Sequence, residues 1–497
     1  MKPLAMVVLA ACLTLTACGG DDVSDGSGTS SSSGNGGPGS SGNPSSPGNG
    51  GTAQAQAGWS TAAAMDGKAA EFEPSTTIDA KGNSLVTWMS NGPSGTTGNE
   101  MWGSRYVAGS GWSTPTRLDT SDGSDAMTGT GTGAPQLVGN ASGQAVAFWT
   151  QWMPAASKYA LWARPYSPSA GWGTATEIAP NITSLTYTAG IDAQGNALVA
   201  WPQSISLLDS RIAWTRYTPD GTWSTTALIQ MPAQTGPGAV TGDTTNVRPM
   251  ISVLPSGSAV LAWGQTNSTQ SAIWTATFDQ TDGWTNINQA VSNTSLFTSI
   301  DTPTAGMDAK GNITLVWGQL DATGGKLYTT TMSQRYVAGT GWQAAQAVAP
   351  EITEAGGFIA TPILSVGANG VAAVMWAQGG VALQASVSDA NGNWGPLHQL
   401  TASIDPTTVQ YPPIVVDPAG NVTAAWQDAG TPGSSDVIAA SYRNGAWTTS
   451  TLFGQDPQDA SWPALAVNAS GAMSLVWQLY INSVGPELQA SFYTPGT

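Results

Sequence analysis

Charged side chains are scarce in this sequence, and basic ones are the scarcest. Only 9% of the 497 residues are charged, and 14 Lys and Arg stand against 31 Asp and Glu, for a net charge of −17. Nucleic-acid binding needs basic side chains to neutralise phosphates, so this balance argues against a nucleic-acid partner. There is one histidine, His398, and no Ser/His/Asp order, zinc spacing or phosphate loop. The sequence therefore predicts no catalytic residue and no metal ligand by motif.

Cysteine is nearly absent. The two cysteines are Cys12 and Cys18, so the remainder of the chain has no thiol for a disulfide or a metal. Both lie in or just after the apolar run "LAMVVLAACLTL", which follows Lys2 and is too short to span a bilayer as a mature helix. We interpret residues 1–17 as a cleaved targeting segment.

The end of this run, "LTAC" (Leu15 to Cys18), resembles the lipobox of bacterial lipoproteins. The resemblance implies cleavage before Cys18, acylation of that cysteine and attachment to a membrane. Gly19 after the cysteine implies, by the same analogy, the outer membrane, with the protein facing the periplasm or the cell surface. An ordinary signal peptide cut nearby is the alternative. Residues 18–57 are rich in Gly, Ser and Pro and predict a flexible linker to a folded body over 58–497.

Glycine and tryptophan are abundant, with 61 and 22 residues, and they recur in one frame. In "IDAKGNSLVTW" (Ile78 to Trp88), glycine lies three positions after Asp79 and tryptophan nine positions after it. Proline lies five positions before the reference residue in seven of the eight units, with Tyr187 the exception. The eight reference residues are Asp79, Asn140, Asp192, Leu254, Asp308, Gly367, Asp417 and Asn468.

This frame predicts a tight hairpin followed by a buried strand. Asp or Asn can bond its own backbone two residues on, and Gly supplies the positive φ that closes the turn. The segments after the turn, such as "NSLVTW" and "NALVAW", are apolar on both faces and predict strands covered on both sides. Proline five positions before the turn suits the first residue of a strand, where no ladder donor is lost.

A second tryptophan follows a Gly-rich turn in each unit, so each unit of 50 to 62 residues predicts four strands, A to D. Four strands are one propeller blade, and the chain therefore predicts an all-β fold, a single eight-bladed β-propeller. The last unit lacks its fourth strand, whereas "GWSTAAAMD" (Gly58 to Asp66) is an unpaired one. We expect this N-terminal strand to close the last blade, which removes a free edge. We also expect a monomer.

The candidate ligand-binding residues lie on the face formed by the D–A and B–C loops, whose lengths vary. Trp152 and Trp462 fall on these loops and are candidates for stacking on a sugar or a partner's side chain. The residues just before the strand-A proline would also face this rim and form a polar and aromatic pocket. They are Glu73, Arg248, Tyr411 and Trp462. The alternative is that each is a solvated loop residue.

Five units carry a glutamine two positions after the first tryptophan. A ring of these amides would line the central funnel and bind a polar ligand, or each would satisfy neighbouring backbone groups. The five are Gln151, Gln203, Gln265, Gln319 and Gln378.

Carboxylates are the remaining chemical groups on this face. A pair of them would serve glycosidic chemistry, although most would be solvated. The segment "DTSDGSD" (Asp119 to Asp125) has oxygen ligands for Ca²⁺ but not the spacing of a known calcium loop. The carboxylates are Glu71, Glu73, Asp122, Asp125, Asp243, Glu351, Glu354, Asp456 and Asp459.

The repeat resembles several propeller families. The turns "PDGTW" and "DANGNW" are similar in place to the Asp-containing turns of sialidases, but the three funnel arginines of a sialidase site are not matched. The eight-bladed quinoprotein-type repeat, which includes the propeller lipoprotein of the outer-membrane barrel-assembly machinery, has Gly one position later and Trp one earlier. Bacterial lipoproteins with "VDxxGNxxxxW" propeller repeats are more similar.

These observations favour a membrane-anchored extracytoplasmic binding or scaffold lipoprotein that recognises a glycan or a protein through the variable-loop face. No cofactor is expected beyond a possible role for Ca²⁺. One alternative is a carbohydrate-active enzyme, a glycoside hydrolase or lyase, that uses the funnel carboxylates. A second alternative is an outer-membrane assembly factor.

Overall fold

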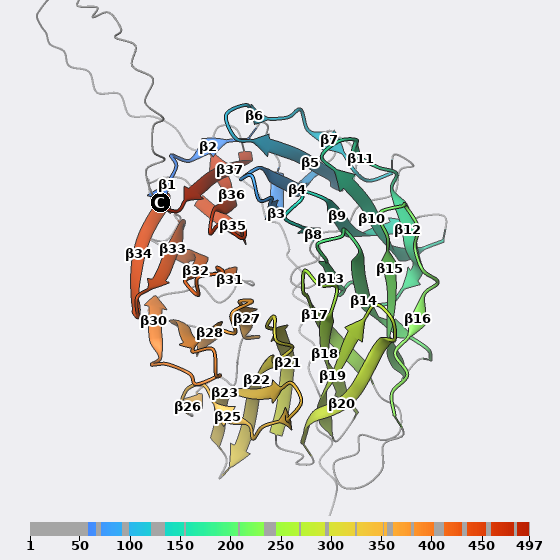
Figure 1. Ribbon diagram of the computed structural model, residues 1–497, viewed down its shortest axis with the longest axis vertical. Helices are drawn as coiled ribbons and strands as arrows, with labels where there is room; N and C mark the ends of the chain where they lie inside the picture. Colours follow the sequence, from blue (N-terminus) through green and yellow to red (C-terminus); the bar gives the residue numbers. More distant parts are fainter. Residues whose placement is uncertain are drawn as a thin grey trace, which may run out of the picture. The chain divides into compact units, whose positions relative to one another are not determined.

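The computed structural model describes most of the folded body. The described residues are 58–65, 71–91, 99–120, 135–153, 156–206, 209–232, 245–267, 270–293, 298–323, 326–350, 352–354, 361–378, 382–401, 412–429, 435–453, 459–481 and 485–496. Residues 1–57, with Cys18, lie outside this part of the chain. The described residues contain no helix and form eight small antiparallel sheets arranged in a ring (Figure 1). The predicted eight-bladed propeller is confirmed.

Each blade has its first strand on the inside of the ring and its last on the outside (Figure 1). Blade 1 has β3 (Glu71–Ile78), β4 (Ser84–Asn91), β5 (Asn99–Val107), β6 (Gly111–Trp112) and β7 (Thr116–Arg117). Blade 2 has β8 (Gln136–Gly139), β9 (Ala145–Met153), β10 (Lys158–Ser167), β11 (Gly171–Trp172) and β12 (Thr176–Ile182). Blade 3 has β13 (Thr188–Ile191), β14 (Ala197–Ser204), β15 (Ser210–Tyr217) and β16 (Ala227–Leu228). Blade 4 has β17 (Thr245–Val253), β18 (Ala259–Thr266), β19 (Ser271–Asp279) and β20 (Gly283–Asn293).

The other half of the ring follows the same order. Blade 5 has β21 (Thr298–Met307), β22 (Ile313–Thr323), β23 (Lys326–Val337), β24 (Gly341–Trp342), β25 (Gln346–Ala347) and β26 (Ile352–Glu354). Blade 6 has β27 (Ile363–Val366), β28 (Ala372–Gln378), β29 (Ala382–Ser388) and β30 (His398–Thr401). Blade 7 has β31 (Ile414–Val416), β32 (Val422–Ala429), β33 (Ser435–Arg443) and β34 (Ala446–Phe453). Blade 8 has β35 (Asp459–Val467), β36 (Met473–Ile481), β37 (Gly485–Thr494), β1 (Gly58–Trp59) and β2 (Ala63–Ala64).

The N-terminal strand closes the last blade, as the orphan segment predicted. In β1, Trp59 pairs with Tyr493 of β37, and β2 pairs with the same strand farther along. Met65, just after β2, is 6% exposed and packs in a cluster with Trp88 of blade 1. Blade 8 is therefore built from both ends of the folded body, which leaves no free edge at the seam.

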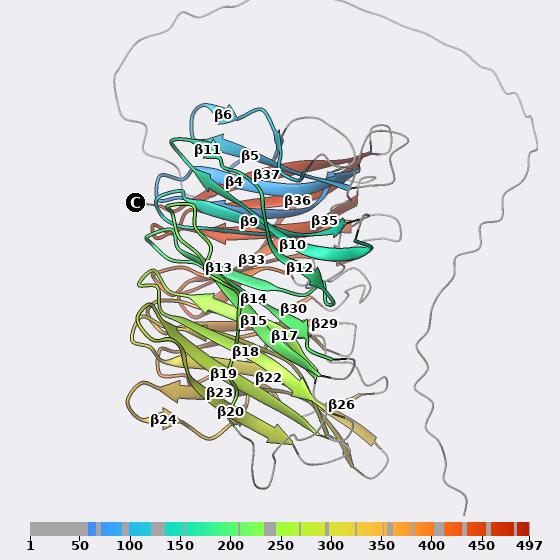
Figure 2. The same ribbon diagram turned by 90° about the vertical axis from the view of Figure 1, so that its right-hand side faces the viewer.

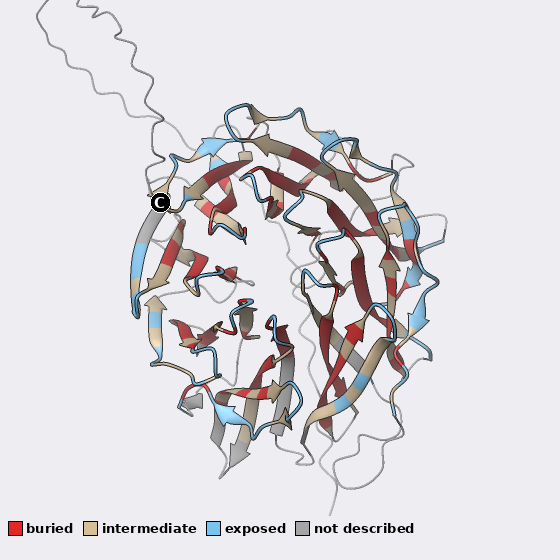
Figure 3. Cartoon of the chain, viewed as in Figure 1, coloured by how far each residue is buried: buried red, intermediate tan, exposed pale blue. Residues whose placement is uncertain are grey.

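The core lies between neighbouring blades. The strand-B tryptophans are buried, and seven of them are among the largest fully buried side chains. Trp149 of blade 2, for example, packs in one cluster with Leu85, Met89 and Met101 of blade 1. Figure 3 shows the buried residues concentrated on the inner and middle strands. Each blade therefore buries its apolar flanks against its neighbours, which confirms that these strands are covered on both sides.

The A–B turns alternate between two hydrogen-bonding patterns. In blades 1, 3, 5 and 7 the reference Asp accepts hydrogen bonds from both the backbone and the side chain of an Asn four positions on, in the pairs Asp79–Asn83, Asp192–Asn196, Asp308–Asn312 and Asp417–Asn421. Three of the other blades have an Asn that donates to a backbone carbonyl of the next turn, in the pairs Asn140–Asp192, Asn369–Pro418 and Asn468–Asp79. The last pair spans the seam, so side chains help to tie the ring together on this face.

The two faces of the ring differ in what they contain. The A–B and C–D turns share one face, which we call the turn face; β6, β11 and β24 lie toward it in Figure 2. The strand ends that lead into the D–A and B–C connections lie on the opposite face, which we call the loop face. The loop face is therefore known here from the ends of the strands that border it.

Candidate functional site

Four inner strands carry a bulge at a residue followed by proline. In β3, β17, β21 and β35 the ladder skips two residues, and the single residue opposite is the strand-B tryptophan. The proline was predicted to begin the strand, but in these four blades it lies within the strand, so that prediction is wrong there. The bulge is the physical reason. It leaves the proline unpaired with the neighbouring strand, so the missing N–H of proline costs no ladder hydrogen bond.

Three bulges hold their pre-proline residue in the left-handed region. The φ angles are 50° at Glu73, 47° at Arg248 and 54° at Trp462, although none of these residues is glycine. Such a conformation is uncommon for side chains of this size and persists where the surrounding structure imposes it. The structure therefore places a carboxyl, a guanidinium and an indole of the predicted pocket at equivalent positions on three inner strands. Tyr411, the fourth, lies outside the described residues.

Glu73 is a buried carboxyl with an unused oxygen. Its side chain is 6% exposed, and Oε2 makes no hydrogen bond within the described part of the chain. Burial raises the pKa of Glu73 from 4.5 to about 7, because the apolar surroundings disfavour the charged form. Burial also raises the pKa of the Tyr187 hydroxyl, and the charge of Glu73 raises it further. Glu73 of blade 1 is thus in electrostatic range of blade 3.

Arg248 reaches from blade 4 to blade 6. Its Nη1 lies 3.5 Å from Oγ1 of Thr361, to which it donates, although the two residues are 113 positions apart. Thr361 itself directly precedes a proline, so both residues occupy the same place in the repeat. The contact joins blades 4 and 6, which are not neighbours in the ring, so the Arg248 side chain extends beyond its own blade.

The described glutamines that follow the strand-B tryptophans bond mainly to side chains of their own blades. Gln151 accepts a hydrogen bond from the Trp149 indole at 2.9 Å, Gln203 from Trp201 at 3.2 Å, and Gln265 from Trp274 at 2.9 Å. Gln319 donates to Asp321, and the side chain of Gln378 lies outside the described residues. Three of the amides therefore satisfy buried indole N–H groups, and a ligand-binding role for the five stays a prediction.

Three of the remaining candidates have structural partners. The side chains of six other predicted carboxylates lie outside the described residues, namely those of Asp122, Asp125, Asp243, Glu351, Glu354 and Asp456. Trp152 was predicted to lie on a loop, but it lies within β9, because the ladder with β10 continues to Met153. It packs edge-on against Tyr159, with ring centroids 4.8 Å apart. The carboxylate of Glu71 accepts the backbone N–H of Leu488, and that of Asp459 accepts the N–H of Ser435. These contacts leave Glu73 as the carboxyl of the predicted set that has a buried oxygen without a hydrogen bond in the described part of the chain.

The described residues give no sign of a metal centre or a membrane-spanning helix. No group of three or more His, Cys, Asp or Glu side chains is placed to hold a metal ion among them. Most of the "DTSDGSD" segment lies outside the described ranges, and Asp119 accepts hydrogen bonds from Arg117. Within the same ranges, no helix has the length and apolarity needed to cross a membrane.

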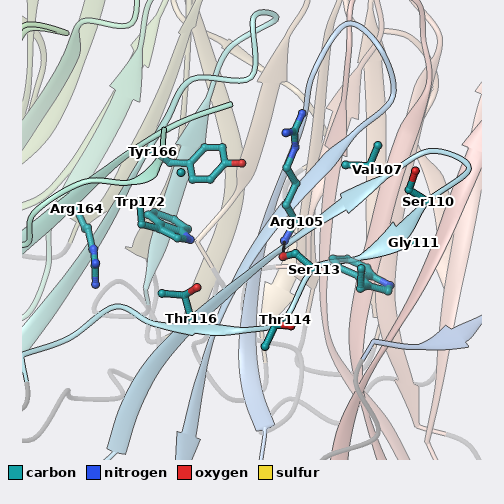
Figure 4. A pocket seen from close by; sticks show the side chains of 12 residues that line it. Arg105, Val107, Ser110, Gly111, Ser113, Thr114, Thr116, Arg164, Tyr166 and Trp172 are labelled. Atoms are coloured by element: carbon teal, nitrogen blue, oxygen red, sulfur yellow. Dashed lines mark hydrogen bonds between the residues drawn. The ribbon is translucent and has the colours of Figure 1, made fainter. Parts of the chain in front are cut away.

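A groove of about 650 Å³ opens between blades 1 and 2 on the outside of the ring, toward the turn face (Figure 4). It is lined by Arg105 and Trp112 of blade 1 and by Arg164, Tyr166 and Trp172 of blade 2. The sequence pattern did not predict this groove. Its only signal was the stretch "RYVAGSGW" (Arg105 to Trp112), which recurs almost unchanged at Arg335 to Trp342. A groove between two blades also depends on the second blade, which this stretch does not include.

No protein-family model matches this sequence, and no curated protein sequence matches it either. Among solved structures, the fold is similar to the polysaccharide lyase Uly1, at 10% identity and a TM-score of 0.47 over 88% of this chain and 99% of that one. It is also similar to an α-L-arabinanase from Penicillium chrysogenum, at 14% identity and a TM-score of 0.38 over 88% and 98%. A protein of unknown function from Dyadobacter fermentans is similar as well, at 10% identity and a TM-score of 0.38 over 87% of this chain and 97% of that one. These likenesses concern the propeller fold alone.

Proposed function

We propose that this protein is a lipid-anchored extracytoplasmic propeller that binds a glycan at the loop-face end of its central channel. Acylated Cys18 would hold it at the outer membrane, and residues 18–57 would tether the propeller. The observation that supports the binding site is the left-handed pre-proline backbone shared by Glu73, Arg248 and Trp462. Strained backbone that recurs at equivalent positions is typical of binding and catalytic sites.

The three side chains have the chemistry of a saccharide site. An indole such as that of Trp462 stacks on the apolar face of a sugar ring, and the guanidinium of Arg248 donates hydrogen bonds to hydroxyl oxygens. Glu73, with a pKa of about 7, is protonated in a large fraction of molecules near neutral pH, so its carboxyl can donate as well as accept. A protein segment is the other ligand class that this site would accept.

A glycan array probed with the labelled full-length protein tests the proposal. We expect binding that falls at least about tenfold in Arg248→Gln and in Trp462→Ala, because each removes a direct ligand contact. Arg216→Gln, on the outer part of blade 3, is the matched control and should bind like the wild type. Equal binding by the wild type and all three variants would contradict the proposed site. Binding to a protein but to no glycan would contradict the proposed class of ligand.

Glu73 also supports a second candidate function, that of a glycoside hydrolase or lyase. A general acid or base works best when its pKa lies near the working pH, and burial places Glu73 there. This candidate predicts release of reducing ends or unsaturated products from a bound polysaccharide, and loss of that release in Glu73→Gln. Binding without any such product would favour the lectin-like function.

A further inference from the structure

The groove between blades 1 and 2 is distinct from the proposed site of Glu73, Arg248 and Trp462, which we call the channel-end site. It lies at the C–D turns of the turn face, whereas Glu73, Arg248 and Trp462 lie near the other ends of the inner strands. Its volume of about 650 Å³ is within the range of small-molecule sites, roughly 300–1,000 Å³. All of its lining residues are in the described part of the chain.

The same octapeptide builds a closed contact elsewhere in the ring. "RYVAGSGW" (Arg105 to Trp112) in blade 1 recurs as "RYVAGTGW" (Arg335 to Trp342) in blade 5. Arg335 is 8% exposed, and its Nη2 donates to the carbonyl of Ala390 in blade 6 at 2.8 Å. In blade 5 the arginine therefore fills the space between the blades and is bound by its neighbour.

Arg105 has no such partner in blade 2. Its side chain is 24% exposed, and its Nη2 forms an ion pair at 3.7 Å with Oδ2 of Asp79 in the same blade. The structure shows no hydrogen bond from this guanidinium to a described residue. Blade 2 has the turn "SPSAG" where blade 6 has "DANGN", so no carbonyl corresponding to that of Ala390 receives it. The difference between the two arginines comes from the neighbouring blade and leaves donors open to solvent.

The indole that forms the opposite wall is also left with an unused donor. In blade 6, Trp394 donates its ring N–H to Ser333 of blade 5 at 2.7 Å. The position of Ser333 is taken in blade 1 by Gly103, against which Trp172 packs so closely that a Cβ would lie 2.8 Å from its ring. No hydrogen bond from the Trp172 N–H reaches another described residue. Figure 4 shows this nitrogen and the Tyr166 hydroxyl directed toward the blade 1 side of the groove.

The charge in the groove is already compensated. Arg105 is paired with Asp79. Arg164 donates to the carbonyls of Gly173, Arg117 and Leu118. Burial lowers the pKa of Arg164, whereas the negative charge of nearby Asp119 raises it and so offsets the positive charge of this guanidinium. With a net charge of −17 on the whole chain, the groove offers hydrogen-bond donors beside aromatic surfaces without an excess of positive charge. That combination suits a neutral polyhydroxyl ligand better than an anion.

We propose that this groove is a second binding site, which takes a neutral sugar unit of an oligosaccharide. The sugar ring packs on an indole wall, and its hydroxyls accept hydrogen bonds from Arg105, Trp172 and Tyr166. The site is independent of the channel-end site and of any enzymatic activity there.

Isothermal titration of the full-length protein in detergent with neutral oligosaccharides, and with the same chains carrying uronic acids, tests this site. We expect neutral chains to bind, with a dissociation constant raised about tenfold in Arg105→Gln and severalfold in Tyr166→Phe, which lose one charged and one neutral donor. Arg216→Gln, the corresponding arginine of blade 3, should leave this binding unchanged. Thermal unfolding of each variant verifies that the ring is intact.

Variants at the channel end separate this proposal from the proposed function. Neutral-sugar binding that survives in Arg248→Gln and Trp462→Ala but weakens in Arg105→Gln would support the groove. Binding that is lost only in the channel-end variants, preference for the uronic-acid chains, or no neutral-sugar binding at all would overturn it. Tyr166→Phe removes only a hydroxyl, so it decides the outcome even if Arg105→Gln does not fold.

Discussion

Glu73 combines three features that seldom occur in one residue: left-handed backbone, burial and an oxygen without a hydrogen bond in the described structure. The bulge imposed by the following proline explains the first, because it takes Glu73 out of the strand ladder. Burial then favours the neutral acid. A side chain that is costly to keep buried on an inner strand is explained more simply by a ligand than by stability.

We expect the stability of the ring to depend on the ionisation of Glu73. Its pKa is about 7 in the folded protein and near 4.5 when the chain is unfolded. Because the folded state binds this proton more tightly, the stabilisation is complete below pH 4.5 and is lost as the pH rises through 7. The difference corresponds to on the order of 3 kcal/mol in the free energy of unfolding.

Urea unfolding of the wild type and of Glu73→Gln between pH 5 and pH 8 measures this effect. The wild type should lose stability relative to the variant as the pH rises, and Glu177→Gln, at an exposed position of blade 2, should follow the wild type. Parallel pH profiles for the wild type and Glu73→Gln would show that Glu73 ionises normally in the folded protein.

The short strands β1 and β2 close the ring. These strands join the start of the folded body to β37, its last strand, and add the backbone hydrogen bonds Ser60–Phe492 and Met65–Leu488. Trp59 and Met65 pack into clusters on the two sides of blade 8. Blade 1 therefore depends on residues that precede it by a few positions but belong to blade 8.

Deletion of residues 58–66 should destabilise the whole propeller. Losing the burial of Trp59 and Met65 costs roughly 3–6 kcal/mol and exposes the edge of β37. Thermal unfolding followed by circular dichroism measures the change, and a deletion of equal length within 18–57 is the control. If the protein without 58–66 melted at the wild-type temperature, closure through these strands would not matter for stability.

Contacts between neighbouring blades hold the ring together. Its two faces differ in the residues that they present. Turns tied by Asp and Asn side chains form one face, and the pre-proline residues lie toward the other. Attachment at one end of the chain by a flexible segment would leave both faces accessible to ligands. For the proposed glycan-binding function, this arrangement would let an extended glycan contact the propeller at more than one place.

The proposed anchor makes a prediction for the complete protein. Wild-type protein should sediment with outer membranes and incorporate labelled fatty acid, and Cys18→Ser should be unlabelled and soluble after cell fractionation. The physical reason is that acyl chains on Cys18 would supply the apolar surface that inserts into the membrane, and serine at this position cannot carry them. Membrane-bound, acylated Cys18→Ser protein would contradict the lipobox interpretation.

Much of the architecture was predictable because its signals are local. The number of blades follows from the glycine and tryptophan that recur around each turn, and the closing strand follows from the unpaired "GWSTAAAMD" segment. Glu73, Arg248 and Trp462 were also predictable as a set, since each precedes a proline at the same place in the repeat. The bulge was not, because nothing within one strand shows that its partner strand continues past the proline.

The amino-acid sequence by itself determined the all-β class, the eight units and the order of strands, since periodic bends and indoles act within one hairpin. Only the tertiary structure decided that Arg335 is buried by blade 6 while Arg105 borders an open groove, although both lie in almost the same octapeptide. Burial, pKa and open space depend on what the adjacent blade presents. Those neighbours meet only when the ring closes.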